Sequence, residues 1–193
     1  MLYPINLELQ DIEITIIGGG DVAYRKCKNF LDFNKHIKVV SNKFIDEFSE
    51  LEDKIEIIED IYKEEYIKNS FIVVAATNNK EINKNIGIYC RNNGKLVNVV
   101  DDIKLSNYTV PSYIKRGDLL LSISTGGKSP SLSAKIKKEL GKMYDDSYEE
   151  YINLLGIARV NIIKKYENIS ERKNILNELI NLTLDELKET IKD

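Results

Sequence analysis

Short apolar runs alternate with amphipathic stretches through the first hundred residues of the chain. Five runs have the length and continuity of buried strands, at residues 12–17, 37–40, 55–58, 71–76 and 96–100. Between them, apolar residues recur at helical spacing over 22–33, near 63–68 and over 80–92. Strands that alternate with helices are typical of a parallel sheet covered by helices. The pattern therefore predicts an α/β fold with a doubly wound, Rossmann-type sheet.

The pattern changes after Asp101. A loop that contains Pro111 leads to an apolar run at 118–124, which predicts a strand outside the nucleotide-binding fold. Ser129 followed by Pro130 is typical of a helix N-cap and its first helical position, and the helix is expected to run to about residue 143. A small α+β domain is therefore expected after the Rossmann sheet.

From residue 147 onward the sequence favours helices throughout. Apolar positions predict two amphipathic helices, with Ile152, Leu155, Ile162 and Tyr166 in the first and Ile175, Leu176, Leu179 and Ile180 in the second. Thr183 with Glu186 predicts a capping box at the start of a third. We thus expect a Rossmann domain at 1–111, an α+β domain at 112–145 and a helical C-terminal domain at 146–193.

The composition is that of a globular protein, with 42% apolar and 31% charged residues. No apolar run approaches the roughly 20 residues that cross a bilayer, and the N-terminus lacks the pattern of an export signal. A cytoplasmic protein without a membrane segment is expected. Cys27 and Cys90 form no CxxC pair and are expected to be reduced, buried thiols, and the single His36 excludes a histidine-rich metal site.

Positive charge is concentrated in one segment of an otherwise acidic chain. The net charge is -3, yet residues 115–142 hold seven basic and two acidic side chains. A local positive field favours a polyanionic small molecule or an acidic partner over nucleic acid, because nucleic-acid domains are usually basic more broadly. A solvated basic helix face is the alternative interpretation.

A glycine-rich turn follows the first predicted strand. Gly18-Gly19-Gly20-Asp21-Val22-Ala23 fits the G-x-G-x-x-G/A pattern of dinucleotide-binding turns and stands where a helix is predicted to begin. Gly18 permits the tight turn, Gly20 lets the backbone approach a pyrophosphate, and the free amides of the helix start, at Asp21 and Val22, suit an anion. The alternative is a glycine-rich turn without a ligand.

The end of the second predicted strand lacks the acid that usually binds the adenine ribose. The sequence there is Ser41-Asn42-Lys43. Asn42 can hydrogen-bond ribose hydroxyls, whereas Lys43 leaves open a 2′-phosphate and hence NADP. Thr77, at the end of the fourth strand, is expected beside the same crevice, with an ordinary strand-to-helix cap as the alternative.

Two further segments carry candidate chemistry. Asn98 and Asp101 lie at the end of the fifth strand, where a carboxylate could act as a general base. Asp101 or Asp102 could instead cap the next turn. Residues 124–130 (STGGKSP) resemble a phosphate-binding P-loop, but Ser122 stands where that motif needs its first glycine, so nucleotide hydrolysis is not expected. Gly126 and Lys128 could instead hold substrate carboxylates.

Taken together, these motifs resemble those of the precorrin-2 dehydrogenase family, some members of which are also sirohydrochlorin ferrochelatases. The similarity is carried by Tyr3-Pro4-Ile5, Gly18 to Ala23 followed by Arg25-Lys26, Ala76-Thr77, Asn98-Val99-Val100-Asp101, Pro111 and Ser124 to Pro130. The resemblance implies a homodimer in which the α+β domain is the dimerisation domain. It also implies oxidation of precorrin-2, a tetrapyrrole, to sirohydrochlorin, with NAD as the hydride acceptor.

The same resemblance implies roles for individual residues. Asp101 would be catalytic, Asn98 and Thr125 would line the tetrapyrrole site, and Asn42 and Lys43 would contact NAD. Some members also insert ferrous iron into sirohydrochlorin, and the resemblance leaves that second reaction open. Two other readings stay open from the residues alone: an NAD-sensing regulatory module, and a dehydrogenase of another anionic substrate.

Overall fold

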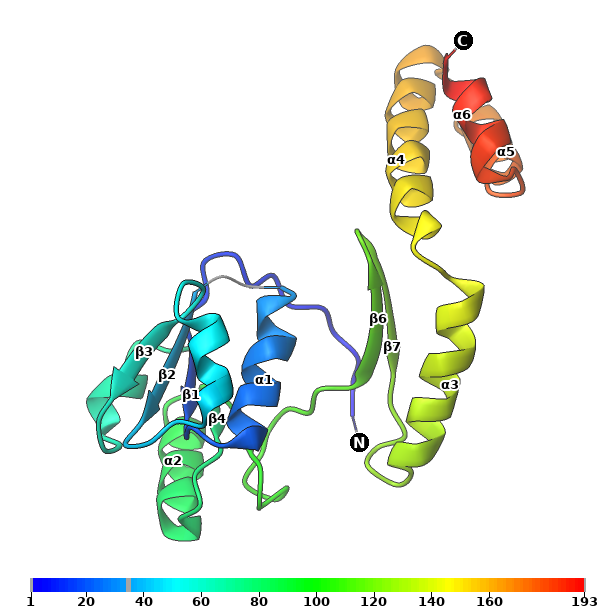
Figure 1. The fold of residues 1–193 in the computed structure, drawn as a ribbon. Helices are drawn as coiled ribbons and strands as arrows, with labels where there is room; N and C mark the ends of the chain where they lie inside the picture. Colours follow the sequence, from blue (N-terminus) through cyan, green and yellow to red (C-terminus); the bar gives the residue numbers. More distant parts are fainter. Residues whose placement is uncertain (1, 34–35, 193) are drawn as a thin grey trace. The chain divides into compact units, whose positions relative to one another are not determined.

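The computed structural model describes residues 2–33 and 36–192 and divides the chain into two compact units, with the boundary in the sequence between Thr109 and Val110 (Figure 1). The first unit holds the parallel sheet and its helices. The second holds a hairpin and four helices in the part of the chain that is described. The predicted division of the second unit after residue 145 stays a prediction.

The first unit is the predicted doubly wound sheet. Five parallel strands lie in the order β3-β2-β1-β4-β5, and the order reverses between β1 and β4. The strands are β1 (Ile14–Ile17), β2 (Ile37–Ser41), β3 (Glu56–Glu59), β4 (Ile72–Ala75) and β5 (Leu96–Val99). The helices are α1 (Asp21–Leu31) and α2 (Lys80–Asn92), with two 3-10 helices, η1 (Asp46–Leu51) and η2 (Glu64–Ile67). All five predicted strands are present, and the stretch at 63–68 forms the 3-10 helix η2.

The continuity of the apolar runs follows from two cores, one on each face of the sheet. Ile14 and Ile16 of β1 belong to the same buried cluster as Ala23 and Cys27 of α1. Ile17 belongs to the opposite cluster, which includes Ile86 and Cys90 of α2. Successive residues of a strand point to opposite faces, so a strand covered on both sides must be apolar throughout.

Both cysteines are buried free thiols, as the sequence predicted. Burial raises the pKa of Cys27 and of Cys90 to about 11, so both thiols are protonated at neutral pH. A protonated thiol is a poor nucleophile, and the two side chains act as small apolar groups in the core.

The second unit opens with a strand that the sequence pattern missed. β6 (Ser112–Arg116) pairs antiparallel with β7 (Leu119–Ile123) through a two-residue turn whose Gly117 has φ +55°. A run at 118–124 predicted β7 alone. β6 carries one buried residue, Ile114, so its apolar signal is too weak to mark a strand. The positive φ of Gly117 suits the tight hairpin turn.

The four helices described in the second unit are α3 (Pro130–Met143), α4 (Ser147–Lys165), α5 (Ile169–Leu179) and α6 (Leu184–Lys192). Two of them, α3 and α6, begin where capping residues predict them. The Ser129 side chain accepts a hydrogen bond from the Leu132 N–H at 3.3 Å. The carboxylate of Glu186 accepts one from the Thr183 N–H at 2.8 Å, as in a capping box.

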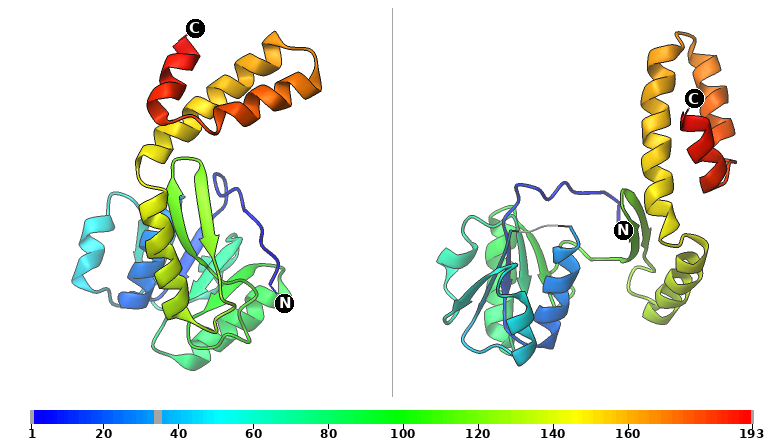
Figure 2. Two further views of the ribbon diagram at one scale, coloured as in Figure 1. Left: turned by 90° about the vertical axis from the view of Figure 1, so that its right-hand side faces the viewer. Right: turned by 45° about the horizontal axis from the view of Figure 1, so that its top comes forward.

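A separate small core holds α4, α5 and α6 together. α5 and α6 both pack against α4 (Figure 2). Ala158, Ile162, Leu179 and Leu187 are buried between them, and the Tyr151 hydroxyl donates to backbone carbonyls that include Leu182 O at 3.1 Å. Among the described residues no helix combines the length and the apolar character needed to cross a membrane.

Candidate functional site

A pocket of about 560 Å³ lies at the carboxyl ends of strands β1 to β4, beside the point where the strand order reverses. Doubly wound sheets bind ligands at this place. Four loops supply the lining: residues 17–20, 40–45, 60–62 and 76–79, together with Ile82 of α2. The pocket therefore brings together five residues that the sequence singled out, namely Gly18, Gly20, Asn42, Lys43 and Thr77.

Gly18 and Gly19 allow the loops at this edge to meet. Gly18 has φ +128°, and a Cβ built on it would lie 2.3 Å from the backbone oxygen of Ala76. A Cβ on Gly19 would lie 2.2 Å from the backbone oxygen of Lys43. No side chain fits at either distance, so the turn closes only with glycine at both positions.

Gly20 differs from its two neighbours because it faces open space. A Cβ on Gly20 would meet no atom within 4 Å. Gly20 is also the N-cap of α1, and no side chain caps this helix. The first amides of α1 are thus available to an anion that approaches along Gly20. Asp21 and Val22, which were also predicted to bind the cofactor, are not part of the pocket lining.

The loop after β2 is held by its own serine. The Ser41 hydroxyl donates to the backbone oxygen of Lys43 at 2.7 Å, which closes a tight turn. Asn42 and Lys43 are exposed within the pocket lining. Both side chains are therefore accessible to a ligand in this pocket.

Thr77 both lines the pocket and joins a network with Asn83, a buried side chain that the sequence did not single out. Asn83 Oδ1 accepts hydrogen bonds from the Thr77 N–H at 3.1 Å and from its hydroxyl at 2.7 Å. Asn83 Nδ2 donates to the Thr77 backbone oxygen at 3.0 Å. Asn83 is fully buried in α2, so this network fixes the loop that follows β4. The only sequence signal for this network was an asparagine in the first turn of the predicted helix at 80–92.

The variant Asn83→Ala is expected to lower the free energy of unfolding by about 2 kcal/mol, because it leaves the backbone N–H and oxygen of Thr77 without their partners in a part-buried network. Asn85→Ala is the matched control, since Asn85 is exposed on the same helix. Chemical denaturation of the three proteins measures the difference. Equal stability of both variants would show that the network contributes nothing.

Asp60 lines the pocket itself and was not selected from the sequence. It follows β3, and its Oδ1 accepts the Ile61 N–H at 2.7 Å. Its Oδ2 pairs with Lys63 Nζ at 2.6 Å and accepts the Tyr66 hydroxyl. Hydrogen bonds from Lys63, Tyr66 and the Ile61 N–H lower the pKa of Asp60 to about 2. Asp60 could have been selected from the sequence as an acid that follows the apolar run at 55–58.

Asn98 and Asp101 lie at the end of β5, outside the pocket lining. Asn98 is half-buried in the strand, and Asp101 is exposed in the turn that follows. The Asp102 carboxylate accepts the Lys104 N–H at 2.8 Å, so Asp102 is the residue that caps this turn. Asp101 projects from the same turn as an exposed carboxylate.

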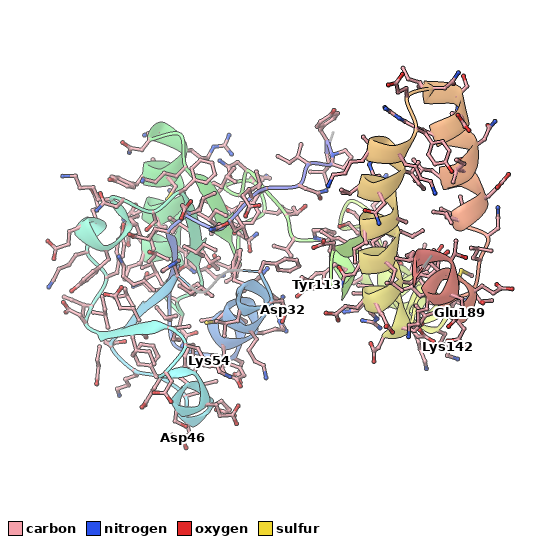
Figure 3. All side chains as sticks on the ribbon, turned by 90° about the horizontal axis from the view of Figure 1, so that it is seen from above. Asp32, Asp46, Lys54, Tyr113, Lys142 and Glu189 are labelled. Atoms are coloured by element: carbon pink, nitrogen blue, oxygen red, sulfur yellow. The ribbon has the colours of Figure 1, made fainter. Side chains whose placement is uncertain are left out.

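The loop from Ser124 to Pro130 belongs to the second unit and is shaped by hydroxyl groups. The Ser129 N–H donates to the Thr125 hydroxyl oxygen at 3.1 Å, and that hydroxyl lies 3.3 Å from the hydroxyl of Ser133. Gly126 and Gly127 have φ +62° and +80°, which turns the chain sharply before α3. Gly126 and Lys128 are exposed. The lysines of the basic segment at 115–142 are also exposed, as Lys142 of α3 illustrates (Figure 3).

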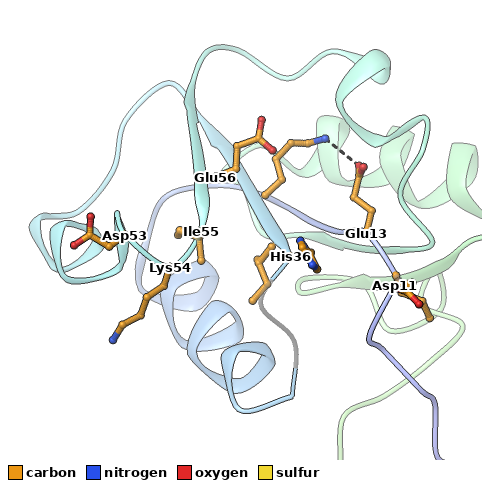
Figure 4. A pocket seen from close by; sticks show the side chains of 10 residues that line it. Asp11, Glu13, His36, Asp53, Lys54, Ile55 and Glu56 are labelled. Carbon is orange, nitrogen blue, oxygen red and sulfur yellow. Dashed lines mark hydrogen bonds and ion pairs between the residues drawn. The ribbon is translucent and has the colours of Figure 1, made fainter.

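A second cavity, of about 610 Å³, lies at the opposite edge of the sheet (Figure 4). Its lining includes Glu13, which pairs with Lys38 at 2.9 Å and accepts the Ser70 hydroxyl at 2.8 Å. Burial raises the pKa of Glu13, but these two partners outweigh burial and leave it below its usual value. The Glu13 carboxylate thus has a structural role, in which it binds Lys38 and Ser70. Nothing predicted as a site residue lies here, and within residues 2–33 and 36–192 no group of three or more histidine, cysteine or acidic side chains could hold a metal.

Comparison with known proteins assigns the chain to a family. A model of an NAD(P)-binding family matches residues 5–112, and a model of the central part of sirohaem biosynthesis proteins matches residues 116–143. The precorrin-2 dehydrogenase of Priestia megaterium is 34% identical over 93% of this chain and 89% of its own length. The chain belongs to the precorrin-2 dehydrogenase family.

Solved structures and longer relatives agree with this assignment to the precorrin-2 dehydrogenases. The structure of a protein named SirC, precorrin-2 dehydrogenase, has a TM-score of 0.78 and 31% identity, and covers 99% of this chain and 98% of its own. A siroheme synthase of Pseudoalteromonas translucida is 28% identical over 88% of this chain. The chain spans 36% of that relative's length. The predicted family and fold are therefore confirmed.

Proposed function

We propose that this chain oxidises precorrin-2 to sirohydrochlorin, with NAD as the hydride acceptor. The observation that carries the proposal is the match to a precorrin-2 dehydrogenase along nearly the whole of both chains. The open glycine turn adds a place for the nicotinamide cofactor at the edge of the sheet where such folds bind ligands. Neither an NAD-sensing module nor a dehydrogenase of another substrate has a comparable observation behind it.

The residues around the pocket fit a dinucleotide. The uncapped start of α1 and the space over Gly20 would receive the pyrophosphate. Asn42 and Lys43 would contact the adenosine half, while the Thr77 loop, held by Asn83, would border the cofactor on the other side of the turn. When bound, the nicotinamide supplies a hydride acceptor for the substrate.

Substrate-binding residues are proposed for each unit by itself. Precorrin-2 is a tetrapyrrole with several carboxylates, which suits the basic segment at 115–142. We assign Lys128 and the Gly126 backbone to binding these carboxylates and Asn98 to the wall of the tetrapyrrole site. Thr125 of the second unit is also proposed as a tetrapyrrole contact, and its hydrogen bond with the Ser129 N–H would keep the loop in shape.

Asp101 is proposed as the catalytic base. Loss of a hydride from precorrin-2 must be accompanied by loss of a proton, and an exposed carboxylate at the end of β5 can accept it. The same carboxylate could take part in insertion of ferrous iron, where iron would be a substrate.

The proposal includes a homodimer formed through the second unit, where Leu120, Leu132 and Met143 expose apolar surface, and a cytoplasmic location.

The experiment is an anaerobic assay of the purified protein with enzymatically generated precorrin-2, in parallel with NAD, with NADP and without nicotinamide. We expect sirohydrochlorin to form fastest with NAD and at the no-enzyme rate without nicotinamide. A protein that binds NAD but leaves precorrin-2 unchanged would contradict the proposal and favour the sensing module or another anionic substrate. Adding ferrous iron to the product, against a no-enzyme control, tests for chelation.

A further inference from the structure

The residue that discriminates NAD from NADP is missing from its usual place in this chain. In dinucleotide-binding folds an acid at the end of the second strand ordinarily binds the ribose 2′-hydroxyl and repels a 2′-phosphate. Here β2 ends at Ser41, and Asn42 and Lys43 follow. Neither provides a negative charge, so a selective site needs its acid from another element.

Strand pairing brings such an acid to the same position from β3. β2 and β3 run parallel, and their register ends with Ser41 opposite Glu59. The Asp60 N–H then donates to the Ser41 backbone oxygen at 3.1 Å. Asp60 therefore leaves β3 directly beside the turn that holds Asn42, and all three residues line one pocket.

The Asp60 carboxylate is fixed and has acceptor capacity to spare. The Ile61 N–H, Lys63 and Tyr66 hold it from one side, and 30% of its side chain stays exposed. Each carboxylate oxygen can accept two hydrogen bonds, and Oδ1 is used by the Ile61 N–H. Because the pKa of Asp60 is lowered to about 2 by these hydrogen bonds, the group is ionised at neutral pH.

The side chain next to it suits the base of the same nucleotide. Ile61 lines the pocket and is 63% exposed. An adenine ring laid against Ile61 would cover apolar surface that water now covers, and its ribose would then lie toward Asp60. The loop after β3 thus offers an apolar contact and a carboxylate in consecutive residues.

We infer that Asp60 is the residue that selects NAD over NADP, by accepting a hydrogen bond from the adenosine ribose and repelling a 2′-phosphate. This inference rests on the proposed nicotinamide site and adds its specificity. Lys63 supports the same outcome, since its ammonium is paired with Asp60 at 2.6 Å and is thereby kept from a phosphate. Loss of the Asp60 charge would remove the repulsion of a 2′-phosphate and would also release Lys63 from its ion pair.

The test is the variant Asp60→Asn, which keeps the side-chain size and the oxygen that accepts the Ile61 N–H. Dissociation constants for NAD and for NADP are measured by titration calorimetry on the purified full chain. We expect the ratio of the two constants to shift toward NADP by about tenfold or more, as removal of one close charge and release of another implies. A ratio that stays within about twofold of the parent value overturns the inference.

Glu65→Gln is the matched control. Glu65 is an exposed acid of the adjoining helix η2 and is not part of the pocket lining, so its loss changes the local charge equally without touching the site. An equal shift in this variant would mean that general charge, rather than Asp60, sets the preference. Asp60→Ser serves as a second variant should Asp60→Asn fail to fold, with the same expected shift.

Binding and turnover separate this inference from the proposed function. Suppose that the parent protein prefers NAD, that Asp60→Asn loses this preference, and that the parent does not oxidise precorrin-2. The specificity role of Asp60 would then stand, and the proposed reaction would be refuted. If the parent protein oxidises precorrin-2 and Asp60→Asn keeps the same preference between NAD and NADP, the proposed reaction would stand and the specificity role of Asp60 would be refuted. A parent protein that binds neither nicotinamide refutes both.

Discussion

Asp101→Asn is expected to lower the turnover number for precorrin-2 oxidation by at least about a hundredfold, the usual contribution of a general base. Asparagine keeps the size of the side chain but cannot take up the proton that leaves precorrin-2 together with the hydride. Asp101 is exposed and lies outside the dinucleotide pocket. The affinity for NAD should therefore stay within about twofold of the parent, and the thermal unfolding midpoint should not move.

The neighbouring acid provides the control for this prediction. The Asp102 carboxylate accepts the Lys104 N–H at 2.8 Å, and Asp102→Asn keeps an oxygen in that place. Its turnover should be close to that of the parent, measured with saturating precorrin-2 and NAD under anaerobic conditions. Full activity of Asp101→Asn, or equal losses in the two variants, would remove Asp101 from the proposed mechanism.

Gly18→Ala is expected to destabilise the first unit by about 3 kcal/mol or more, because overpacking and a strained backbone act together. The new Cβ would lie 2.3 Å from the Ala76 backbone oxygen, at a φ of +128°. Backbone atoms of two adjoining strands cannot move aside as a flexible side chain can. Denaturant unfolding measures the loss, and the variant is expected to accumulate poorly as folded protein.

Gly20→Ala should behave in the opposite way, although it changes the same turn by the same methyl group. A Cβ at Gly20 meets nothing within 4 Å, and its φ of -95° is accessible to alanine. Stability should be kept while NAD binding weakens by about tenfold or more, since the methyl group occupies the approach to the helix start. An unchanged dissociation constant in a folded Gly20→Ala protein would place the pyrophosphate elsewhere.

The sequence predicted the sheet well because its strands are covered on both faces. Continuous apolar runs such as 71–76 have few alternatives to a buried strand. The predicted helix at 80–92 matches the bounds of α2 because its apolar positions recur regularly, and the structure adds Asn79 as its N-cap. β6 was missed for the converse reason, since only Ile114 of that strand is buried. The short η1 was missed because a 3-10 turn lacks a helical repeat long enough to detect.

The candidate site was predictable where a motif is local and was missed where partners come together only in space. The glycine turn places its three glycines within one loop, so Gly18 and Gly20 could be selected from spacing alone. Asp60 and Asn83 gained their importance from strand register and from a buried partner, which no local pattern encodes. Asp60 reaches the β2 turn only because β3 pairs with β2.

The most direct test of the central claim is the stoichiometry of one anaerobic reaction, in which NADH and sirohydrochlorin are quantified together as precorrin-2 is consumed by the purified protein. Balanced hydride transfer predicts about one NADH for each sirohydrochlorin formed, at a rate that depends on the amount of protein. Sirohydrochlorin that appears equally fast without nicotinamide, or NADH that fails to accumulate with it, would contradict the account.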